Sequence, residues 1–279
     1  MEIKEKIKEI LQKDVYDARD LAKIVEILRA PGGCPWDREQ THESIRNDFI
    51  EETYEVIEAI DKKDPALLRE ELGDVLLQVA MHAEMEREQG RCTFDDIAND
   101  VCRKMIHRHP HVFGDVRADT SAEVLSNWEV IKSEEKKRES ITDKLNAIPR
   151  QFPALMRAVK VGKKASAMDF PDAESVALKV EEELAEVRAA MAAGDKEQIT
   201  EEMGDLLLTV ASLARKLHVN AEFALTAATD KFIARFAAVE AAVNAAGKRF
   251  EELSDAELDI FWQNCKKNVK KGAKYTKNI

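Results

Sequence analysis

The chain has 279 residues, enough for one or two ordinary domains, and 44% of them are hydrophobic, which can supply a buried core. Charged residues make up 35%, with only 10 glycines and 7 prolines, a composition typical of a helix-rich protein. The net charge of −11 argues against broad binding to nucleic acids or membrane surfaces, because both are polyanionic. No run approaches the ~18 apolar residues of a membrane span, and the four cysteines form no CxxC pair. We therefore expect a cytoplasmic protein without nucleic-acid or membrane partners.

The first copy of the main pattern begins after a loop. Residues 29–42 read RAPGGCPWDREQTH, whose prolines and glycines predict a loop that we call the entrance segment. Apolar residues then recur at steps of three and four over 49–60 and 67–85, which predicts two helices. The intervening DKKDP separates them, and Pro65 suits the first turn of the second helix. A link this short predicts antiparallel neighbours.

The second half of the chain repeats the first. EETYEVIEAIDKKDPALLREELGDVLLQVA (51–80) aligns without a gap with EELAEVRAAMAAGDKEQITEEMGDLLLTVA (182–211), so the offset is 182 − 51 = 131 residues. Among the residues that the repeat retains are the acidic ones at 51, 52, 55, 71 and 74 and, further on, a lysine, an arginine and a tryptophan in the same order. Helical periodicity alone does not explain such a match, and we interpret it as a duplication.

The predicted fold is all-α, with two tandem copies of a four-helix-type module, because neither copy shows a β pattern longer than a few residues. Between the copies, KSEEKKRESITDKLNAIPRQFP (132–153) is highly charged and contains two prolines, which predicts a connector. We place the domains at residues 1–144 and 145–279. In the second copy, ASAMDFPD (165–172) corresponds loosely to the entrance segment, and Gly194 suits a helix C-cap.

Each copy carries carboxylates at helical spacing, first EExxE and then ExxD. Residues three apart share one helix face, with Cβ atoms ~5–6 Å apart. Four carboxylates converging between two helices would repel by ~3 kcal/mol per close pair at an effective dielectric constant near 20, so they either face water or surround a cation. Carboxylates without Cys or His select a hard ion such as Mg²⁺, with Mn²⁺ as a possible substitute. The candidate ligands are Glu52, Glu55, Glu71 and Asp74 in the first copy and Glu183, Glu186, Glu202 and Asp205 in the second.

Basic and aromatic residues follow the acidic motifs in both copies. Lys231 and Arg235 stand four residues apart, which places two cations on one helix face. They suit the oxygens of a phosphate chain, and arginine can bind such oxygens bidentately. Trp262 could stack on a nucleobase or close a pocket.

Together these residues resemble the MazG family, the nucleoside triphosphate pyrophosphohydrolases of the all-α NTP pyrophosphatase group. The resemblance rests on EExxE followed by ExxD in both copies, on the tandem arrangement, and on GGCPWDREQTH, RHPHVFGD and NWEVIKSEEK in the first copy. It covers roughly residues 15–265. It implies a homodimer that uses Mg²⁺ to hydrolyse a nucleoside triphosphate to the monophosphate and pyrophosphate, by direct attack of water.

The resemblance also implies roles for individual residues. The eight candidate ligands would hold the metal, and those of the second copy would form its catalytic set, namely Glu183, Glu186, Glu202 and Asp205. The substrate contacts would be Lys179, Glu182, Lys231, Arg235 and Trp262 in the second copy, with Glu51, Lys104, Arg108 and Trp128 in the first.

The two copies are not equivalent. Lys179 stands one turn before Glu183, whereas the first copy has Asp48 at the corresponding position. Because an anion in place of a cation should weaken triphosphate binding, we expect the second copy to be the main active site. Gln198 departs from the lysine that the family commonly has there.

Two other readings fit part of the pattern. A ferritin-like di-iron protein also uses carboxylates on helices, but it requires Glu-x-x-His motifs, and here the last residue of each motif is aspartate. A helical regulatory or protein-binding module with degenerate sites would keep the fold without catalysis. This second alternative suits the first copy better than both copies together.

Overall fold

A computed structural model of the chain describes residues 3–135 and 140–272. These residues form helices and connecting turns and contain no strand, so the all-α prediction is confirmed for this part of the chain. The chain divides into two compact units, residues 1–136 and 137–279. The division falls within the expected connector, of which residues 136–139 lie outside the described residues. The expected boundary at residue 145 stays a prediction.

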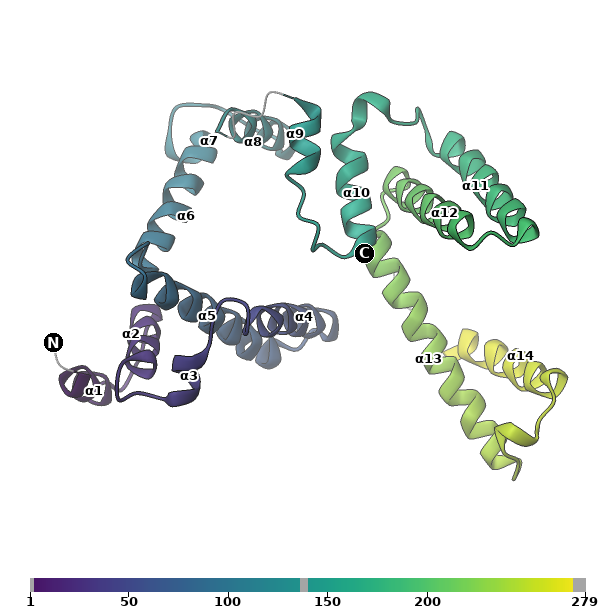
Figure 1. Cartoon of the computed structure of the whole chain (residues 1–279), viewed down its shortest axis with the longest axis horizontal. Helices are drawn as coiled ribbons and strands as arrows, with labels where there is room; N and C mark the ends of the chain where they lie inside the picture. Colours follow the sequence, from purple (N-terminus) through teal and green to yellow (C-terminus); the bar gives the residue numbers. More distant parts are fainter. Residues whose placement is uncertain (1–2, 136–139, 273–279) are drawn as a thin grey trace. The chain divides into compact units, whose positions relative to one another are not determined.

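The first unit consists of a long helical hairpin with shorter helices around it (Figure 1). Its helices are α1 (Ile3–Leu11), α2 (Ala18–Arg29), α3 (Pro35–Glu39), α4 (Arg46–Lys62), α5 (Pro65–Glu88), α6 (Phe94–Arg108), α7 (Pro110–Phe113) and α8 (Ser121–Glu135).

The second unit contains a matching hairpin and a second helix pair (Figure 1). Its elements are α9 (Ile141–Asn146), α10 (Ala154–Lys164), η1 (Ser166–Met168), α11 (Ala173–Ala193), α12 (Lys196–Lys216), α13 (Ala221–Ala245), η2 (Phe250–Glu252) and α14 (Asp255–Gly272). The short helix α9 lies within the expected connector. It forms there because Ser140 and Asp143 make a capping box.

The two hairpins are closed by the same kind of link. In the first unit, Lys63 ends α4 with a left-handed backbone (φ 55°), and Asp64 caps α5 by accepting from two backbone N–H groups. In the second unit, Gly194 ends α11 in the same conformation (φ 71°), and Asp195 caps α12. Glycine adopts this conformation without a steric penalty, which confirms the C-cap predicted at residue 194.

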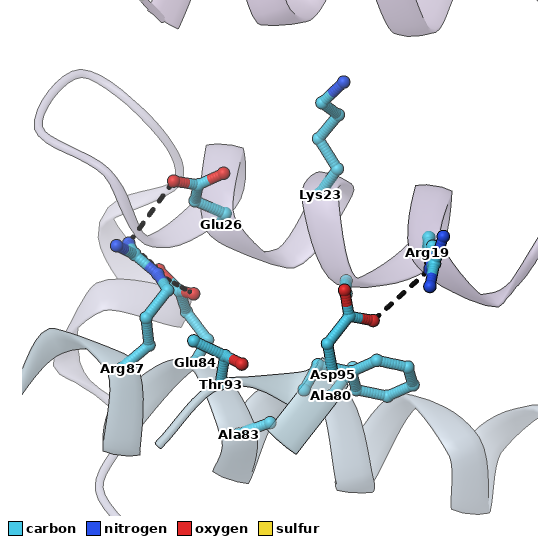
Figure 2. Close-up of a pocket in the computed structure, with 11 residues that line it drawn as sticks. Arg19, Lys23, Glu26, Ala80, Ala83, Glu84, Arg87, Thr93 and Asp95 are labelled. Atoms are coloured by element: carbon cyan, nitrogen blue, oxygen red, sulfur yellow. Dashed lines mark hydrogen bonds and ion pairs between the residues drawn. The ribbon is translucent and has the colours of Figure 1, made fainter. Parts of the chain in front are cut away.

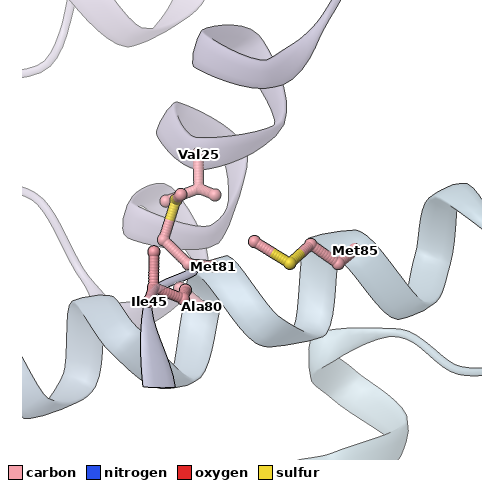
Figure 3. Packing of buried hydrophobic residues seen from close by; sticks show 5 residues of the cluster. All are labelled: Val25, Ile45, Ala80, Met81 and Met85. Carbon is pink, nitrogen blue, oxygen red and sulfur yellow. The ribbon is translucent and has the colours of Figure 1, made fainter. Parts of the chain in front are cut away.

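The core of the first unit lies where α2 packs on α5. Val25, Ile45, Ala80, Met81 and Met85 are buried together there (Figure 3). Ile45 comes from the residue before α4, so this cluster also fixes the start of the hairpin. The second unit has a comparable core between α13 and α14, where Val239, Val243 and Cys265 pack with partly buried aromatic side chains.

The entrance segment is a folded element attached to α5. Arg29, which is buried, donates from Nε and Nη2 to Glu88 at 2.9 Å each. Its Nη1 donates to the backbone carbonyls of Asp37 and Gln40. At the end of the segment, the ring of His42 stacks on His82 of α5, with the two Nδ1 atoms 2.7 Å apart. These contacts hold the segment on the C-terminal half of α5.

The corresponding segment of the second unit is held by ion pairs in which the signs are exchanged: the segment carries the acidic residue and the helix carries the basic ones. Asp169 pairs with Arg215 (Nη2–Oδ1, 2.5 Å) and with Lys216 (Nζ–Oδ2, 2.9 Å) at the end of α12. Gly162 of α10 makes room for this arginine, because a Cβ there would lie 3.1 Å from Arg215 Nε. Within the described ranges, the structure contains no helix with both the length and the apolar character needed to cross a bilayer.

Candidate functional site: two carboxylate clusters

The first carboxylate cluster consists of Glu52 and Glu55 on α4 and Glu71 on α5. One carboxylate oxygen from each of the three lies within 4.8 Å of the others. Burial raises the pKa of Glu52, and the charges of Asp74 and Glu55 raise it further. Burial and the neighbouring Glu55 likewise raise the pKa of Glu71. The cluster is therefore an arrangement of like charges that a cation would relieve.

The second carboxylate cluster consists of Glu183 and Glu186 on α11 and Glu202 on α12, again with oxygens within 4.8 Å of one another. Glu183 is buried. Burial raises the pKa of Glu186, and the charges of Glu183 and Glu202 add to this shift against the lowering effect of Lys179. In both copies the last two glutamates of EExxE and the first residue of ExxD thus converge, which is part of the predicted group of four carboxylates.

The aspartates of the two ExxD motifs do not join these groups of three. Asp74 lies one turn beyond Glu71, close enough for its charge to raise the pKa of Glu52 and Glu71. Asp205 occupies the corresponding turn of α12. The structure therefore brings together three of the four predicted ligands in each copy, and a ligand role for either aspartate stays a prediction.

A lysine distinguishes the second cluster from the first. Lys179 Nζ lies 2.8 Å from Glu182 Oε1 and 2.8 Å from Glu183 Oε1. These hydrogen bonds raise the pKa of Lys179, so its ammonium group is firmly charged. The corresponding residue of the first copy is Asp48, and Glu51 beside it is exposed. The first cluster thus lacks the internal cation that the second one has.

The donor sets fit a hard divalent cation. Each cluster offers three carboxylate groups, and neither includes a histidine or cysteine. Oxygen-only donor sets are those that Mg²⁺ and Mn²⁺ prefer. Burial and like charges raise the pKa of Glu52, Glu71 and Glu186, and such carboxylates are costly to keep ionised without a nearby positive charge.

In the first unit, two of the predicted substrate-binding residues, Arg108 of α6 and Trp128 of α8, contact each other. Arg108 is buried and bonds Glu135 of α8 through Nε (3.1 and 3.2 Å) and through Nη2. Its guanidinium carbon also lies 5.3 Å from the centre of the Trp128 ring, and Lys132 Nζ lies over the same ring at 4.2 Å. Lys104, one turn before Arg108, is exposed.

In the second unit, the corresponding residues lie on α13 and α14, away from the carboxylates. Trp262 packs against Phe232, with ring centres 5.4 Å apart, beside a hollow of about 420 Å³ that Phe236 and Phe250 also line. Lys231 is exposed and Arg235 half-buried on α13. The helix α13 leads away from the α11–α12 hairpin (Figure 1) and packs with α14, so these residues belong to a different helix pair from the second carboxylate cluster.

A groove in the first unit has a different character. It lies between α2, α5 and α6, has a volume of about 300 Å³, and contains none of the predicted site residues (Figure 2). Its charged side chains pair with one another: Arg87 with Glu84 (2.6 Å) and Glu26 (3.4 Å), and Arg19 with Asp95 (3.3 Å). The carboxylate clusters, and not this groove, are therefore the candidate sites.

Sequence reasoning did not find two features near the site. One is Glu135, whose spacing of seven residues from Trp128, two helical turns, placed it on the same face. The other is the row of aromatic rings formed by Phe232, Phe236 and Phe250 beside Trp262. The i, i+4 spacing of Phe232 and Phe236, immediately after Lys231 and Arg235, was the available signal.

Comparison with known proteins connects this geometry to a family. The sequence matches the MazG nucleotide pyrophosphohydrolase domain twice, at residues 40–113 and 172–239. Each match contains one of the two carboxylate clusters.

Two curated relatives resemble the chain over most of its length. A protein of Thermotoga maritima, named nucleoside triphosphate pyrophosphohydrolase/pyrophosphatase MazG, is 43% identical over 249 residues, which cover 88% of this chain and 94% of the relative. The nucleoside triphosphate pyrophosphohydrolase of Escherichia coli K12 is 44% identical over 252 residues, 88% of this chain and 96% of the relative. The Mycobacterium tuberculosis protein of that name is 38% identical over a shorter region, 54% of this chain and 46% of the relative.

Proposed function

The chain belongs to the MazG family, and from this we propose that it hydrolyses nucleoside triphosphates to the monophosphate and pyrophosphate with the help of Mg²⁺ or Mn²⁺. The observation that carries the proposal is the pair of carboxylate clusters, each built from two adjacent helices. A helical regulatory module would have no need to gather three buried or crowded carboxylates twice. A di-iron centre would require histidine ligands, which neither cluster contains.

In the proposed reaction, water attacks a phosphorus atom, the bond between the α- and β-phosphates breaks, and pyrophosphate leaves. Glu183, Glu186 and Glu202 would hold the cation, with Asp205 next to them. A divalent cation at this place supplies positive charge that stabilises the phosphate oxygens as the bond breaks. A carboxylate of this set accepts the proton of the attacking water. None of the predicted site residues has the environment of a covalent nucleophile, so direct hydrolysis is the simplest course.

The second copy is the proposed main active site. Lys179 already lies against Glu182 and Glu183, where it can turn toward the phosphates of an incoming nucleotide. In the first copy Asp48 would repel them. In the first copy Glu135 also binds Arg108, the counterpart of Arg235, whereas no carboxylate pairs with Arg235 among the described residues.

The arrangement of the second unit supports the proposal of a homodimer. Lys231, Arg235 and Trp262 lie apart from the carboxylates of their own chain, so another copy of the chain would bring such residues to the site. Apolar side chains that α11, α12 and α13 leave exposed support this, since contiguous exposed apolar surface marks interfaces. Leu207 is 52% exposed and Phe232 is 55% exposed. Further examples are Leu178, Met191, Leu208 and Ile233.

The direct test is product analysis. Purified protein is incubated with ATP and Mg²⁺, and the nucleotides and phosphates are separated by chromatography. The expected products are AMP and pyrophosphate, and EDTA should abolish their formation. ADP with inorganic phosphate would place cleavage at a different bond and contradict the proposal. Absence of turnover with every common nucleoside triphosphate would favour the regulatory module.

A further inference from the structure

We propose that Glu135 keeps the first unit from taking a nucleotide, so that this unit holds a cation site without a working triphosphate site. The inference rests on the proposed function, because it assumes that the arginine of this module binds phosphate. Besides Asp48, it adds a second specificity-determining residue, Glu135, which keeps the arginine of the first unit from binding the nucleotide.

The first step is the occupancy of Arg108. Glu135 occupies its Nε and one terminal nitrogen in the bidentate geometry that a phosphate would use. Both partners are shielded, since the side chain of Arg108 is 9% exposed and that of Glu135 is 26% exposed. An incoming phosphate would have to displace a carboxylate already paired with this guanidinium group. Arg108 would therefore contribute little to the free energy of nucleotide binding.

The second step concerns the aromatic ring. Two cations, Arg108 and Lys132, lie over Trp128. A base that stacked on this ring would compete with them. In the second unit the contacts differ, because Trp262 lies against Phe232 and borders an open apolar hollow. The two units thus present the same residue types in closed and open arrangements.

The third step is the origin of the difference. Glu135 stands seven residues after Trp128 (135 − 128), and the residue seven after Trp262 (269 − 262) is Val269. The second copy therefore has no carboxylate at this point of its sequence. A single position accounts for the pairing of Arg108 and for the lack of a matching pair at Arg235 among the residues that the structure describes.

The test measures by calorimetry how many nucleotides bind to each chain, using the full chain and Mg²⁺. The ligand is α,β-methylene-ATP, which is not cleaved because a methylene group replaces the oxygen between the α- and β-phosphates. The wild type should bind one nucleotide per chain. Glu135→Gln should bind two. The affinity of the first unit for the nucleotide should be at least roughly tenfold higher than in the wild type, as expected when a charged hydrogen bond no longer competes. The double variant Arg108→Gln/Glu135→Gln should again bind one nucleotide per chain, because the guanidinium group that Glu135→Gln makes available is then absent.

The control removes an unrelated ion pair of the same unit. Glu9 pairs with Lys23 at 2.8 Å, and Glu9→Gln should leave the count at one. Glu135→Ala serves as a second variant if circular dichroism shows that Glu135→Gln does not fold. Two nucleotides in the wild type, or one in both Glu135 variants, would overturn the inference while leaving the proposed function intact. Absence of binding in the wild type and in all variants would contradict the proposed function itself.

Discussion

The two copies of the module keep the same carboxylates but surround them differently. In each, two glutamates of one helix meet a third from its hairpin partner. Around the first cluster lie Asp48 and Asp74, and Arg108 of the same unit is bound by Glu135. Beside the second cluster lies Lys179, and the corresponding arginine has no carboxylate partner in the described ranges. The carboxylate cluster is thus present in both copies, whereas, among the described residues, the lysine and the unpaired arginine that would suit a nucleotide are found in one.

The largest expected effect comes from removing a glutamate of the second cluster, with the matched change in the first cluster as its control. Glu183→Gln should lower turnover of ATP at least about 100-fold, since even outer-shell partners of metal ligands cost 10–100-fold. Glu52→Gln, the matched change in the first cluster, should leave turnover near that of the wild type. Steady-state kinetics on the two variants checks both. Loss of activity in Glu52→Gln alone would reverse the assignment of the active copy.

The second expected effect separates the clusters by charge. Without nucleotide, Lys179 competes with a cation for Glu183, whereas no lysine competes at the first cluster. The first cluster should therefore bind Mn²⁺ more tightly than the second. Lys179→Met should strengthen Mn²⁺ binding at the second cluster by about tenfold, the value of one charged hydrogen bond.

Titration of Mn²⁺ followed by electron paramagnetic resonance distinguishes the two sites. Two classes of sites are expected, the tighter removed by Glu52→Gln and the weaker by Glu183→Gln. In Lys179→Met the Mn²⁺ affinities of the two classes should become more similar. A single class in the wild type, or an unchanged weaker class in Lys179→Met, would show that the lysine does not distinguish the copies.

The parts of this site that could be predicted from sequence are those governed by local rules. Helical spacing placed Glu52 with Glu55 on one face, and the short link with its αL residue fixed how α4 meets α5. The same rules identified the Gly194 cap. Local spacing does not determine the rotation of a helix against its partner, which depends on packing. For that reason Asp74 was expected among the ligands but lies outside the group of three.

Contacts between distant residues were not predictable in this way. Arg108 and Glu135 are 27 residues apart, and Arg215 and Asp169 are 46 apart. Each pair forms only because segments far apart in the sequence pack together, and neither sequence neighbourhood specifies the partner. Lys231 and Arg235 lie on α13 and not on the α11–α12 hairpin, and their position has the same origin, since it depends on the direction in which α13 leaves α12 (Figure 1).

The smallest expected effect concerns the ion pairs that fasten the loop before each hairpin. In the second unit, Asp169 bonds Arg215 and Lys216, and these hydrogen bonds hold the pKa of Asp169 well below its usual range. Asp169→Asn should lower the free energy of unfolding at pH 7 by about 2 kcal/mol, the value of hydrogen bonds to a charged group. In the first unit, Glu88→Gln should cost less, because Glu88 is 37% exposed whereas Asp169 is 16% exposed.

Acid should abolish the difference between the wild type and Asp169→Asn. Because the folded-state pKa of Asp169 is depressed, its contribution is fully present above the unfolded-state pKa of roughly 4 and is lost as pH falls toward the folded-state value. Urea denaturation at a series of pH values should therefore show the two proteins converging below about pH 4. A difference that stayed constant down to low pH would mean that Asp169 acts through packing. Charge would then not be what fastens this segment to α12.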